Sequence, residues 1–189
     1  MQLELLFVTS NPFKIEEAEE ILAPHSIHVT GLDIKIEELQ TDDTDRLVKD
    51  KLLTAFKLVS RPLFVEHTGL HLVHLGGLPG GLTQLFWDRL EADRFCELFG
   101  RTADPSVTAR TVIGYVDGRT RHTFHGEVTG RVAESPRGPR DFQWDCCFVP
   151  DGQTQTYAEL GRERKNEISM RRRALESFAA FLLNGDGDG

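Results

Sequence analysis

Residues 3–14 read LELLFVTSNPFK, and this stretch decides how the chain begins to fold. Its first six residues form a short apolar run that is typical of a buried strand. Helix-start signals follow at once, because Asn11 can cap a helix and Pro12 suits the first helical position. A strand that passes directly into a helix is typical of an α/β domain.

Strand and helix patterns alternate along the rest of the chain. The apolar patterns predict an α/β fold with a mixed sheet, in which Asp117-Gly118 signals a hairpin turn. Strands are predicted within 28–36, at 63–66, around 70–72, at 111–115, and as two further strands up to about residue 134. Helices are predicted at 15–22, 45–59, 82–99 with an interruption near 91–93, and from 169 onward.

The 189 residues are enough for one sizeable core, and no repeat or low-complexity linker divides them. We therefore predict a single domain over residues 1–183. The last six residues, 184–189, read NGDGDG, and we predict that this small, acidic tail is disordered.

Charge and composition limit the partners and the compartment. A net charge of -8 argues against a nucleic-acid polymer, which usually demands a basic face. No apolar run approaches the roughly 18 residues that a membrane helix needs, and the first residues lack the features of a signal peptide. Cys96, Cys146 and Cys147 have no metal-like spacing, so we expect reduced thiols. These features predict a cytoplasmic protein without a membrane partner.

Cations stand at two predicted helix starts, where the helix dipole disfavours them. Lys14 lies in the first turn after Asn11, and Arg171-Arg172-Arg173 opens the last helix. Backbone amides at a helix start, together with one cation, make a binding site for an anion such as phosphate. Each cation could instead be an ordinary solvated side chain, but two such starts favour phosphate binding.

Other side chains could complete such a site. Lys51 lies beside the apolar face of its predicted helix, so it either extends to solvent or reaches a cleft. Glu37, Glu38 and Glu66 are carboxylates suited to Mg²⁺, which needs only one or two of them beside substrate phosphates. His67 follows Glu66 at the end of a predicted strand, a frequent place for functional groups, although a lone histidine is as often structural.

The stretch Phe142-Gln143-Trp144-Asp145 lies in a loop rich in proline, glycine and arginine. Its aromatic rings could stack on a nucleobase while the polar groups read the edge of the base. Alternatively, Trp144 is a core residue and Asp145 belongs to a turn. Composition alone does not separate these interpretations.

Taken together, these segments resemble the inosine triphosphate pyrophosphatase family in six ordered blocks. The first block is TSNPFK at 9–14 followed by Glu16-Glu17, which is similar to the family's TGNxxK-x-EE, and the second is EHTGL at 66–70 with LGGLPG at 75–80, similar to ED-[ST]-GL with LGGxPG. The third is FHGEVTG at 124–130, similar to F-x-G-x-x-x-G, and the fourth is PRG at 136–138 with FQWD at 142–145, similar to PRG with FGWD. The last two are TYAEL at 156–160, similar to TYAEL, and KNEISMR at 165–171, similar to KNxxSHR.

The resemblance implies an elongated mixed sheet flanked by helices, with two lobes around a central nucleotide-binding cleft. It also implies a homodimer that hydrolyses ITP, dITP or XTP to the monophosphate and pyrophosphate with Mg²⁺, or with Mn²⁺. The implied catalytic residues are Lys14, Glu66 and His67, and the implied metal ligands are Glu38 and Glu66. The implied substrate-binding residues are Thr9, Ser10, Asn11, Lys14, Lys51, Phe142, Gln143, Trp144, Asp145, Lys165 and Arg171.

The chain departs from the family pattern at residues that the resemblance places in catalysis and in binding of the base. The acidic dyad has become Glu66-His67, and Met170 and Gln143 replace a histidine and a glycine at the base site. Gln84 occupies a position at which a lysine is common in the family. Since general-base catalysis is worth about 10²–10⁴-fold in rate, these changes predict retained nucleotide binding with weakened hydrolysis.

Two other functions remain open on the sequence. The chain could be a catalytically impaired (d)ITP sensor that regulates a partner effector protein, for example in antiphage defence. It could also be a scaffold without a ligand, although the retained Lys14, Lys51, Trp144, Lys165 and Arg171 argue against that.

Overall fold

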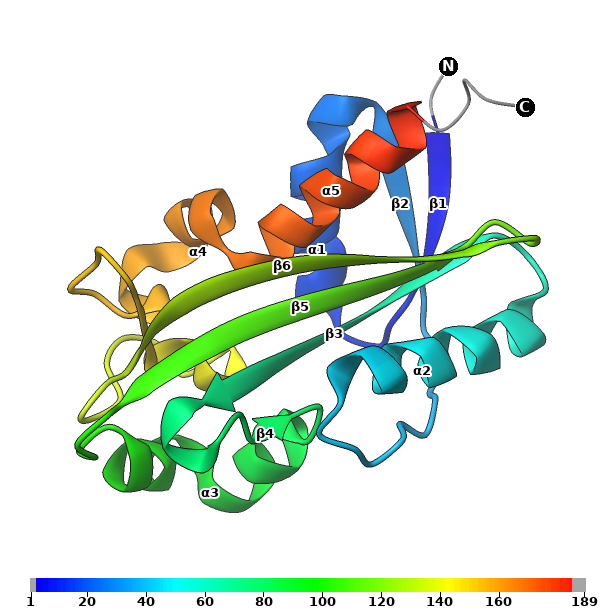
Figure 1. Ribbon diagram of the computed structural model, residues 1–189. Helices are drawn as coiled ribbons and strands as arrows, with labels where there is room; N and C mark the ends of the chain where they lie inside the picture. Colours follow the sequence, from blue (N-terminus) through cyan, green and yellow to red (C-terminus); the bar gives the residue numbers. More distant parts are fainter. Residues whose placement is uncertain (1–2, 185–189) are drawn as a thin grey trace.

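The computed structural model describes residues 3–184, which form one seven-stranded mixed sheet flanked by helices (Figure 1). The strand order is β2-β1-β3-β5-β6-β7, with β4 beside β3, and β1 is parallel to both β2 and β3 while the other pairs are antiparallel. This confirms the predicted α/β fold. The strands are β1 Leu3–Val8, β2 Ile27–Leu32, β3 Leu63–Leu72, β4 Pro79–Gly80, β5 Ser106–Val116, β6 Arg121–Val132 and β7 Phe148–Pro150.

Helices cover both faces of the sheet. In Figure 1, α1 and α5 lie on one face and α2 lies on the other, while α3 and α4 surround the far ends of the long strands. The α-helices are α1 Pro12–Leu22, α2 Thr44–Val59, α3 Thr83–Phe99, α4 Tyr157–Ile168 and α5 Met170–Asn184. Short 3-10 turns are η1 Ala23–His25, η2 Val73–Leu75 and η3 Gln143–Cys146. The long strands β3, β5 and β6 therefore connect two lobes.

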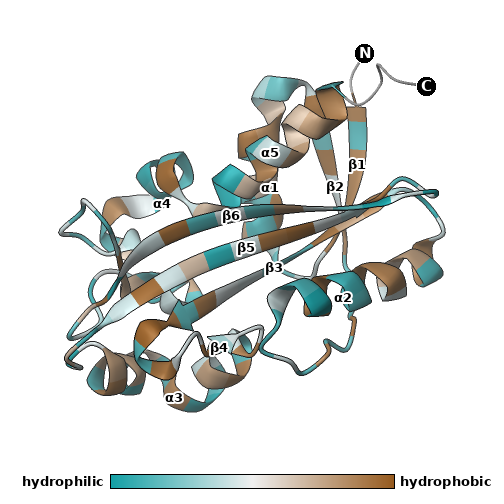
Figure 2. Ribbon diagram, in the orientation of Figure 1, coloured by the Kyte–Doolittle hydropathy of each residue, from teal (hydrophilic) through white to brown (hydrophobic). Residues whose placement is uncertain are grey.

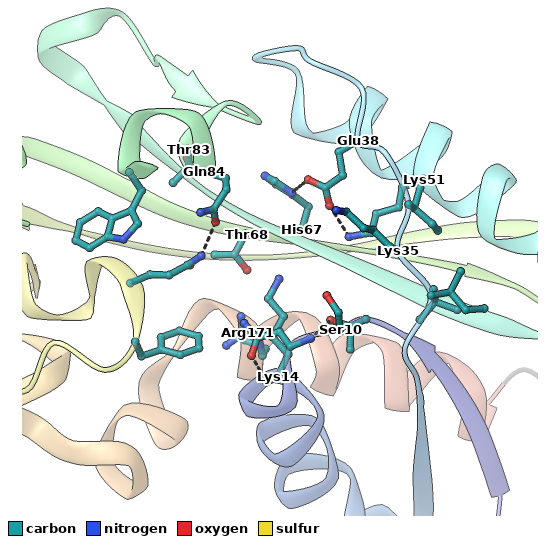
Figure 3. Close-up of a pocket in the computed structure, with 18 of the residues that line it drawn as sticks. Ser10, Lys14, Lys35, Glu38, Lys51, His67, Thr68, Thr83, Gln84 and Arg171 are labelled. Atoms are coloured by element: carbon teal, nitrogen blue, oxygen red, sulfur yellow. Dashed lines mark hydrogen bonds and ion pairs between the residues drawn. The ribbon is translucent and has the colours of Figure 1, made fainter. Parts of the chain in front are cut away.

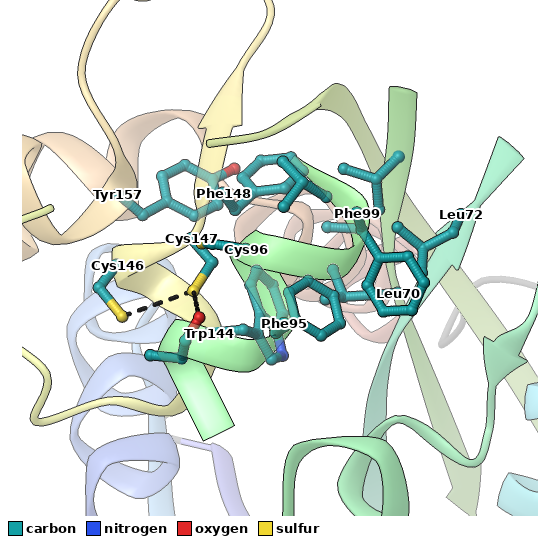
Figure 4. Packing of buried hydrophobic residues seen from close by; sticks show 14 of the residues in the cluster. Leu70, Leu72, Phe95, Cys96, Phe99, Trp144, Cys146, Cys147, Phe148 and Tyr157 are labelled. Atoms are coloured by element: carbon teal, nitrogen blue, oxygen red, sulfur yellow. Dashed lines mark hydrogen bonds between the residues drawn. The ribbon is translucent and has the colours of Figure 1, made fainter. Parts of the chain in front are cut away.

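Three hydrophobic clusters form the core. One lies under α1 and α5, a second lies under α2, and the third fills the lobe that contains α3, η3 and β7. Bands of hydrophobic and hydrophilic residues alternate along β6 (Figure 2), since one face of this strand is buried, whereas the second half of β5 is buried on both faces. Figure 4 shows the third cluster, where Phe95, Phe148 and Tyr157 pack beside the free, buried thiols of Cys146 and Cys147.

Two predicted strand breaks are wrong. The stretches 63–66 and 70–72 belong to one strand, β3, and a single strand, β6, follows the hairpin where two were expected. Thr68-Gly69 interrupts the apolar pattern, but Gly69 stays in the ladder opposite Arg110 of β5, and β4 passes close to it. A Cβ atom at Gly69 would lie 2.4 Å from the carbonyl oxygen of Gly80. The glycine therefore allows a close backbone approach within the strand.

The helix predictions are closer to the structure. Asn11 caps α1 and Pro12 begins it, and α3 carries the expected interruption at Glu91. Helix α4 was missed, although Thr156 and Glu159 form a capping box at its start. Helix α5 includes Asn184, which was assigned to the tail, and residues 185–189 lie outside the described residues, so their disorder stays a prediction.

Among residues 3–184, the structure contains no helix that is both long and apolar enough to span a bilayer.

Gly126 on β6 allows α5 to lie directly against the sheet. A Cβ atom there would meet the Met170 carbonyl oxygen at 2.0 Å and the Ala174 amide nitrogen at 2.6 Å. These are backbone atoms that cannot rotate away, so α5 itself would have to move.

We expect Gly126→Ala to lower the free energy of unfolding by about 2 kcal/mol or more, because the added methyl group overpacks this contact. Urea denaturation measures the loss. The control is Glu127→Ala, since that side chain is exposed on the other face of β6. We expect this substitution to change the free energy of unfolding by less than about 0.5 kcal/mol. Equal stability of Gly126→Ala and wild type would contradict the close packing.

Candidate active site

A cavity of about 320 Å³ opens between the two lobes, and we call it the main cavity (Figure 3). It is bordered by the β1–α1 turn, the segment 33–41, β3, and the starts of α3, η3 and α5. Most of the site residues predicted from the sequence line it. These are Thr9, Ser10, Asn11, Lys14, Glu38, Lys51, His67, Phe142, Gln143, Trp144 and Arg171.

The remaining predicted residues lie just behind this lining. Asp145 and Lys165 line a second cavity of about 230 Å³, and Phe142 is shared by the two cavities. Glu66 is buried on β3 beneath the main cavity and is only 3% exposed. The structure thus gathers these residues into one region, whereas the candidate carboxylate Glu37 is exposed and lines neither cavity. The functional roles of all of them stay predictions.

The start of α1 places Lys14 at the main cavity. The Asn11 side chain accepts hydrogen bonds from the Phe13 amide at 3.0 Å and from the Lys14 amide at 3.4 Å. The cap orients the first turn so that the Lys14 ammonium lies 3.4 Å from Glu66 Oε1. Burial lowers the pKa of Lys14, and the neighbouring Glu66 carboxylate opposes that shift.

Glu66 is the point where the two unusual helix starts meet. Arg171 Nε donates to Glu66 Oε2 at 2.8 Å and Arg171 Nη2 to Oε1 at 3.2 Å, while the Thr68 hydroxyl donates at 2.7 Å. Burial by itself would raise the pKa of Glu66, but Arg171 and Lys14 hold it well below its usual value. The carboxylate is therefore ionised at neutral pH.

Arg171 links this carboxylate to a longer chain of charges. Its guanidinium also donates to Glu17, so two carboxylates raise its pKa although burial acts against the charge. Glu17 lies 3.1 Å from Lys165 Nζ, which is 2.6 Å from Asp145. Alternating charges thus run from the main cavity to the second cavity.

Glu17 is a site residue that the sequence analysis missed. The sequence analysis named it only as part of the first motif block, whereas it is buried and contacts both Arg171 and Lys165. Its spacing of three from Lys14 places both residues on one side of the helix, and this signal could have identified it.

Glu38 lies at the mouth of the main cavity with two basic neighbours. Lys51 Nζ donates to Glu38 Oε1 at 2.6 Å, and His67 Nδ1 lies 3.4 Å from Glu38 Oε2 (Figure 3). Burial would raise the pKa of Glu38, but the hydrogen bond with His67 and the charge of Lys51 lower it overall. The other ring nitrogen, His67 Nε2, is buried without a hydrogen-bond partner in the described part of the chain.

The aromatic loop contributes to the core and also lines the main cavity, while its contact with a base stays a prediction. Trp144 is a core residue that is only 2% exposed, and it also lines the main cavity. Phe142 lies with its ring centroid 4.0 Å from Lys165 Nζ, and Gln143 Nε2 donates to Gln84 Oε1 at 2.6 Å across the cavity. Burial raises the pKa of Asp145 even though Lys165 opposes this shift.

The side chains fit a divalent cation that shares its ligands with phosphate. Among residues 3–184, no group of three or more His, Cys, Asp or Glu side chains forms a complete metal cage. Glu38 is 30% exposed at the cavity, with Lys51 on Oε1 and His67 beside Oε2. It would offer an oxygen to Mg²⁺, bound mainly through phosphates and water, by giving up one of these contacts. Both oxygens of Glu66 already accept hydrogen bonds, so Glu66 could serve as a ligand only by giving up a donor.

Comparison with known proteins gives consistent matches along nearly the whole chain. The sequence model of the Ham1 family matches residues 5–181. The dITP/XTP pyrophosphatase of Methanopyrus kandleri is 35% identical over 183 residues, which cover 96% of this chain and 97% of that relative. The inosine triphosphate pyrophosphatase of Yarrowia lipolytica is 36% identical over 95% of this chain and 96% of its own. The structure of a HAM1 protein from Coxiella burnetii has a TM-score of 0.81 at 25% identity, covering 96% of this chain and 99% of that chain.

We expect Glu66→Gln to lower the free energy of unfolding at pH 7 by about 3 kcal/mol, because it leaves the buried Arg171 charge partly unpaired. The folded-state pKa of Glu66 is depressed, so its contribution is present above the unfolded pKa of about 4.3 and is lost as the pH falls below that value. The variant should therefore lose less stability than wild type between about pH 5 and about pH 3.

Urea denaturation across this pH range measures both effects. The matched control is Glu163→Gln on the exposed side of α4, which should change stability by less than about 0.5 kcal/mol. If Glu66→Gln and wild type lost stability in parallel on acidification, Glu66 would not be held in its ionised form.

Proposed function

Because the chain belongs to the Ham1 family, we propose that its main cavity binds non-canonical purine nucleoside triphosphates such as ITP, dITP and XTP. Relatives that match nearly its whole length are dITP/XTP pyrophosphatases and an inosine triphosphate pyrophosphatase. The proposal rests on one observation, that Lys14 and Arg171 both form ion pairs with Glu66 beside the cavity. Two helix starts with their cations are suited to phosphate oxygens.

The nucleotide would lie along the main cavity with its phosphates at the turn Thr9–Lys14 and at Lys51. Its base would lie at the Phe142 end, where an aromatic ring provides a stacking surface. Lys165 and Asp145, directly behind Phe142, are suited to reading the edge of a purine, with Arg171 nearby.

The proposed reaction is hydrolysis between the α- and β-phosphates. A water oxygen forms a bond to the α-phosphorus, the bond from that phosphorus to the bridging oxygen breaks, and pyrophosphate leaves with the bonding electrons. His67, at the cavity wall beside Glu38, is the group that would accept the water proton. Because a histidine replaces the acidic residue of the family pattern, we expect weakened hydrolysis.

We also propose Mg²⁺ as the metal, with Glu38 as its protein ligand; Glu66 would join only by giving up a hydrogen bond. A bound Mg²⁺ neutralises charge on phosphate oxygens. Lys14 and Lys51 would orient the phosphates around it. The homodimer implied by the resemblance and the cytoplasmic location expected from the composition stay predictions. Sizing of the purified protein and fractionation of cells would test them.

The direct test combines calorimetric binding of dITP with measurement of pyrophosphate release in Mg²⁺ and in Mn²⁺. We expect saturable binding by wild type and turnover below about 1 s⁻¹, the low end of usual enzyme rates. Lys14→Ala should weaken dITP binding about tenfold or more, because it removes a charge-assisted contact with phosphate. Lys57→Ala, on the exposed side of α2, is the control. Absence of dITP binding by wild type would overturn the proposal.

His67→Asp restores a carboxylate at the cavity wall, and we expect it to raise the rate of pyrophosphate release at least about tenfold. His25→Asp, at an exposed position in η1, should leave the rate unchanged. If His67→Asp turns over dITP no faster than wild type, the histidine is not the cause of weak hydrolysis.

A second candidate function is that of a (d)ITP sensor that regulates an effector protein. The presence of His67 in place of the acidic residue, while the cations remain in the cavity, favours it. Slow hydrolysis would suit a sensor, because a ligand that is rapidly destroyed cannot hold a conformational equilibrium. Turnover of about 1 s⁻¹ or faster would exclude the sensor, whereas a larger protein that co-purifies and dissociates on addition of dITP would support it.

A further inference from the structure

Lys35 is a lysine of the main cavity that the sequence analysis did not assign to any site. It lies in the segment 33–43, which connects β2 to α2 and has no regular secondary structure. Its neighbours Ile34 and Ile36 are partly buried and pack against the hydrophobic cluster under α2. Lys35 is therefore held at the cavity between two hydrophobic anchors.

Lys35 differs from the other cations of the main cavity in having no partner. Lys14 lies 3.4 Å from Glu66, Lys51 lies 2.6 Å from Glu38, and Arg171 lies 2.8 Å from Glu66. Within residues 3–184, Lys35 makes no hydrogen bond or ion pair. The cavity thus contains a positive charge that no protein carboxylate neutralises, in a chain whose net charge is -8.

The position of Lys35 separates it from the aromatic end of the cavity. In Figure 3, Lys35 lies with Lys51 and Glu38, whereas Gln84 lies at the opposite end. Gln84 is hydrogen-bonded to Gln143, which neighbours Phe142. If the base lies at Phe142, a chain of phosphates would extend toward Lys35.

We propose that Lys35 binds the terminal phosphates of the nucleotide and makes the cavity select triphosphates over monophosphates. This inference rests on the proposed function, because it assumes that a purine nucleotide occupies the cavity. An unpaired ammonium gains a charge-assisted contact with phosphate without giving up a carboxylate partner. A monophosphate lacks the terminal phosphates that would extend toward Lys35 from the Phe142 end.

The test measures calorimetric binding of dITP, dIMP and inorganic tripolyphosphate to wild type, Lys35→Ala and Lys35→Glu. We expect Lys35→Ala to weaken dITP and tripolyphosphate binding about tenfold and to change dIMP binding less than about twofold. Lys35→Glu should weaken the two triphosphates further. The difference between wild type and the variants should shrink as salt rises, since the side chain is exposed to solvent.

The control variant is Lys57→Ala, which removes an exposed lysine outside the cavity, and thermal unfolding checks that each variant is folded. If wild type binds dITP and both Lys35 variants bind it equally well, the inference is overturned while the proposed function stands. Equal weakening of dITP and dIMP would also overturn it, because Lys35 would then act near the α-phosphate. If wild type binds neither dITP nor tripolyphosphate, both proposals fail.

Discussion

The buried ion pair between Glu66 and Arg171 is the constraint on which the site depends. It joins the centre of β3 to the start of α5, two elements far apart in the chain, and removes both charges from water. Such a pair is stable only when further hydrogen bonds and charges satisfy its remaining atoms. Thr68 and Lys14 do so for Glu66, and Glu17 does so for Arg171. Removing one member would therefore leave an uncompensated charge in the interior.

This pair also couples the fold to the cavity. Gly126 lets α5 lie against β6, which brings Arg171 to Glu66, and the Asn11 cap brings Lys14 to the same carboxylate. The cations at the floor of the cavity are thus fixed by partners below them before any ligand arrives. Preorganised charges of this kind bind an anion without the cost of ordering flexible side chains. Lys35, by contrast, has no such partner among residues 3–184.

The departures from the family pattern are spread around the cavity. His67 lies on β3, Gln84 and Gln143 lie at the end opposite Lys35, and Met170 is buried at the start of α5. At β3, His67 contacts Glu38, which Lys51 also contacts, while the turn Thr9–Lys14 follows the pattern closely. The residue proposed to accept the water proton therefore differs from the pattern, whereas the turn proposed to bind phosphate follows it. The two proposed functions, weak hydrolysis and nucleotide sensing, both rest on this difference.

The sequence by itself determined the α/β class, the start of α1 at Asn11-Pro12, the kink of α3 and the set of residues that gather at the cavity. These features depend on local capping, hydrophobic period and motif spacing, which can be read within a short window. The tertiary structure alone decided that Gly69 continues β3, that Glu17 is buried between Arg171 and Lys165, and that Lys35 is unpaired. Each of these depends on atoms from distant segments, and no local pattern records which backbone passes close to a glycine or which carboxylate reaches a lysine.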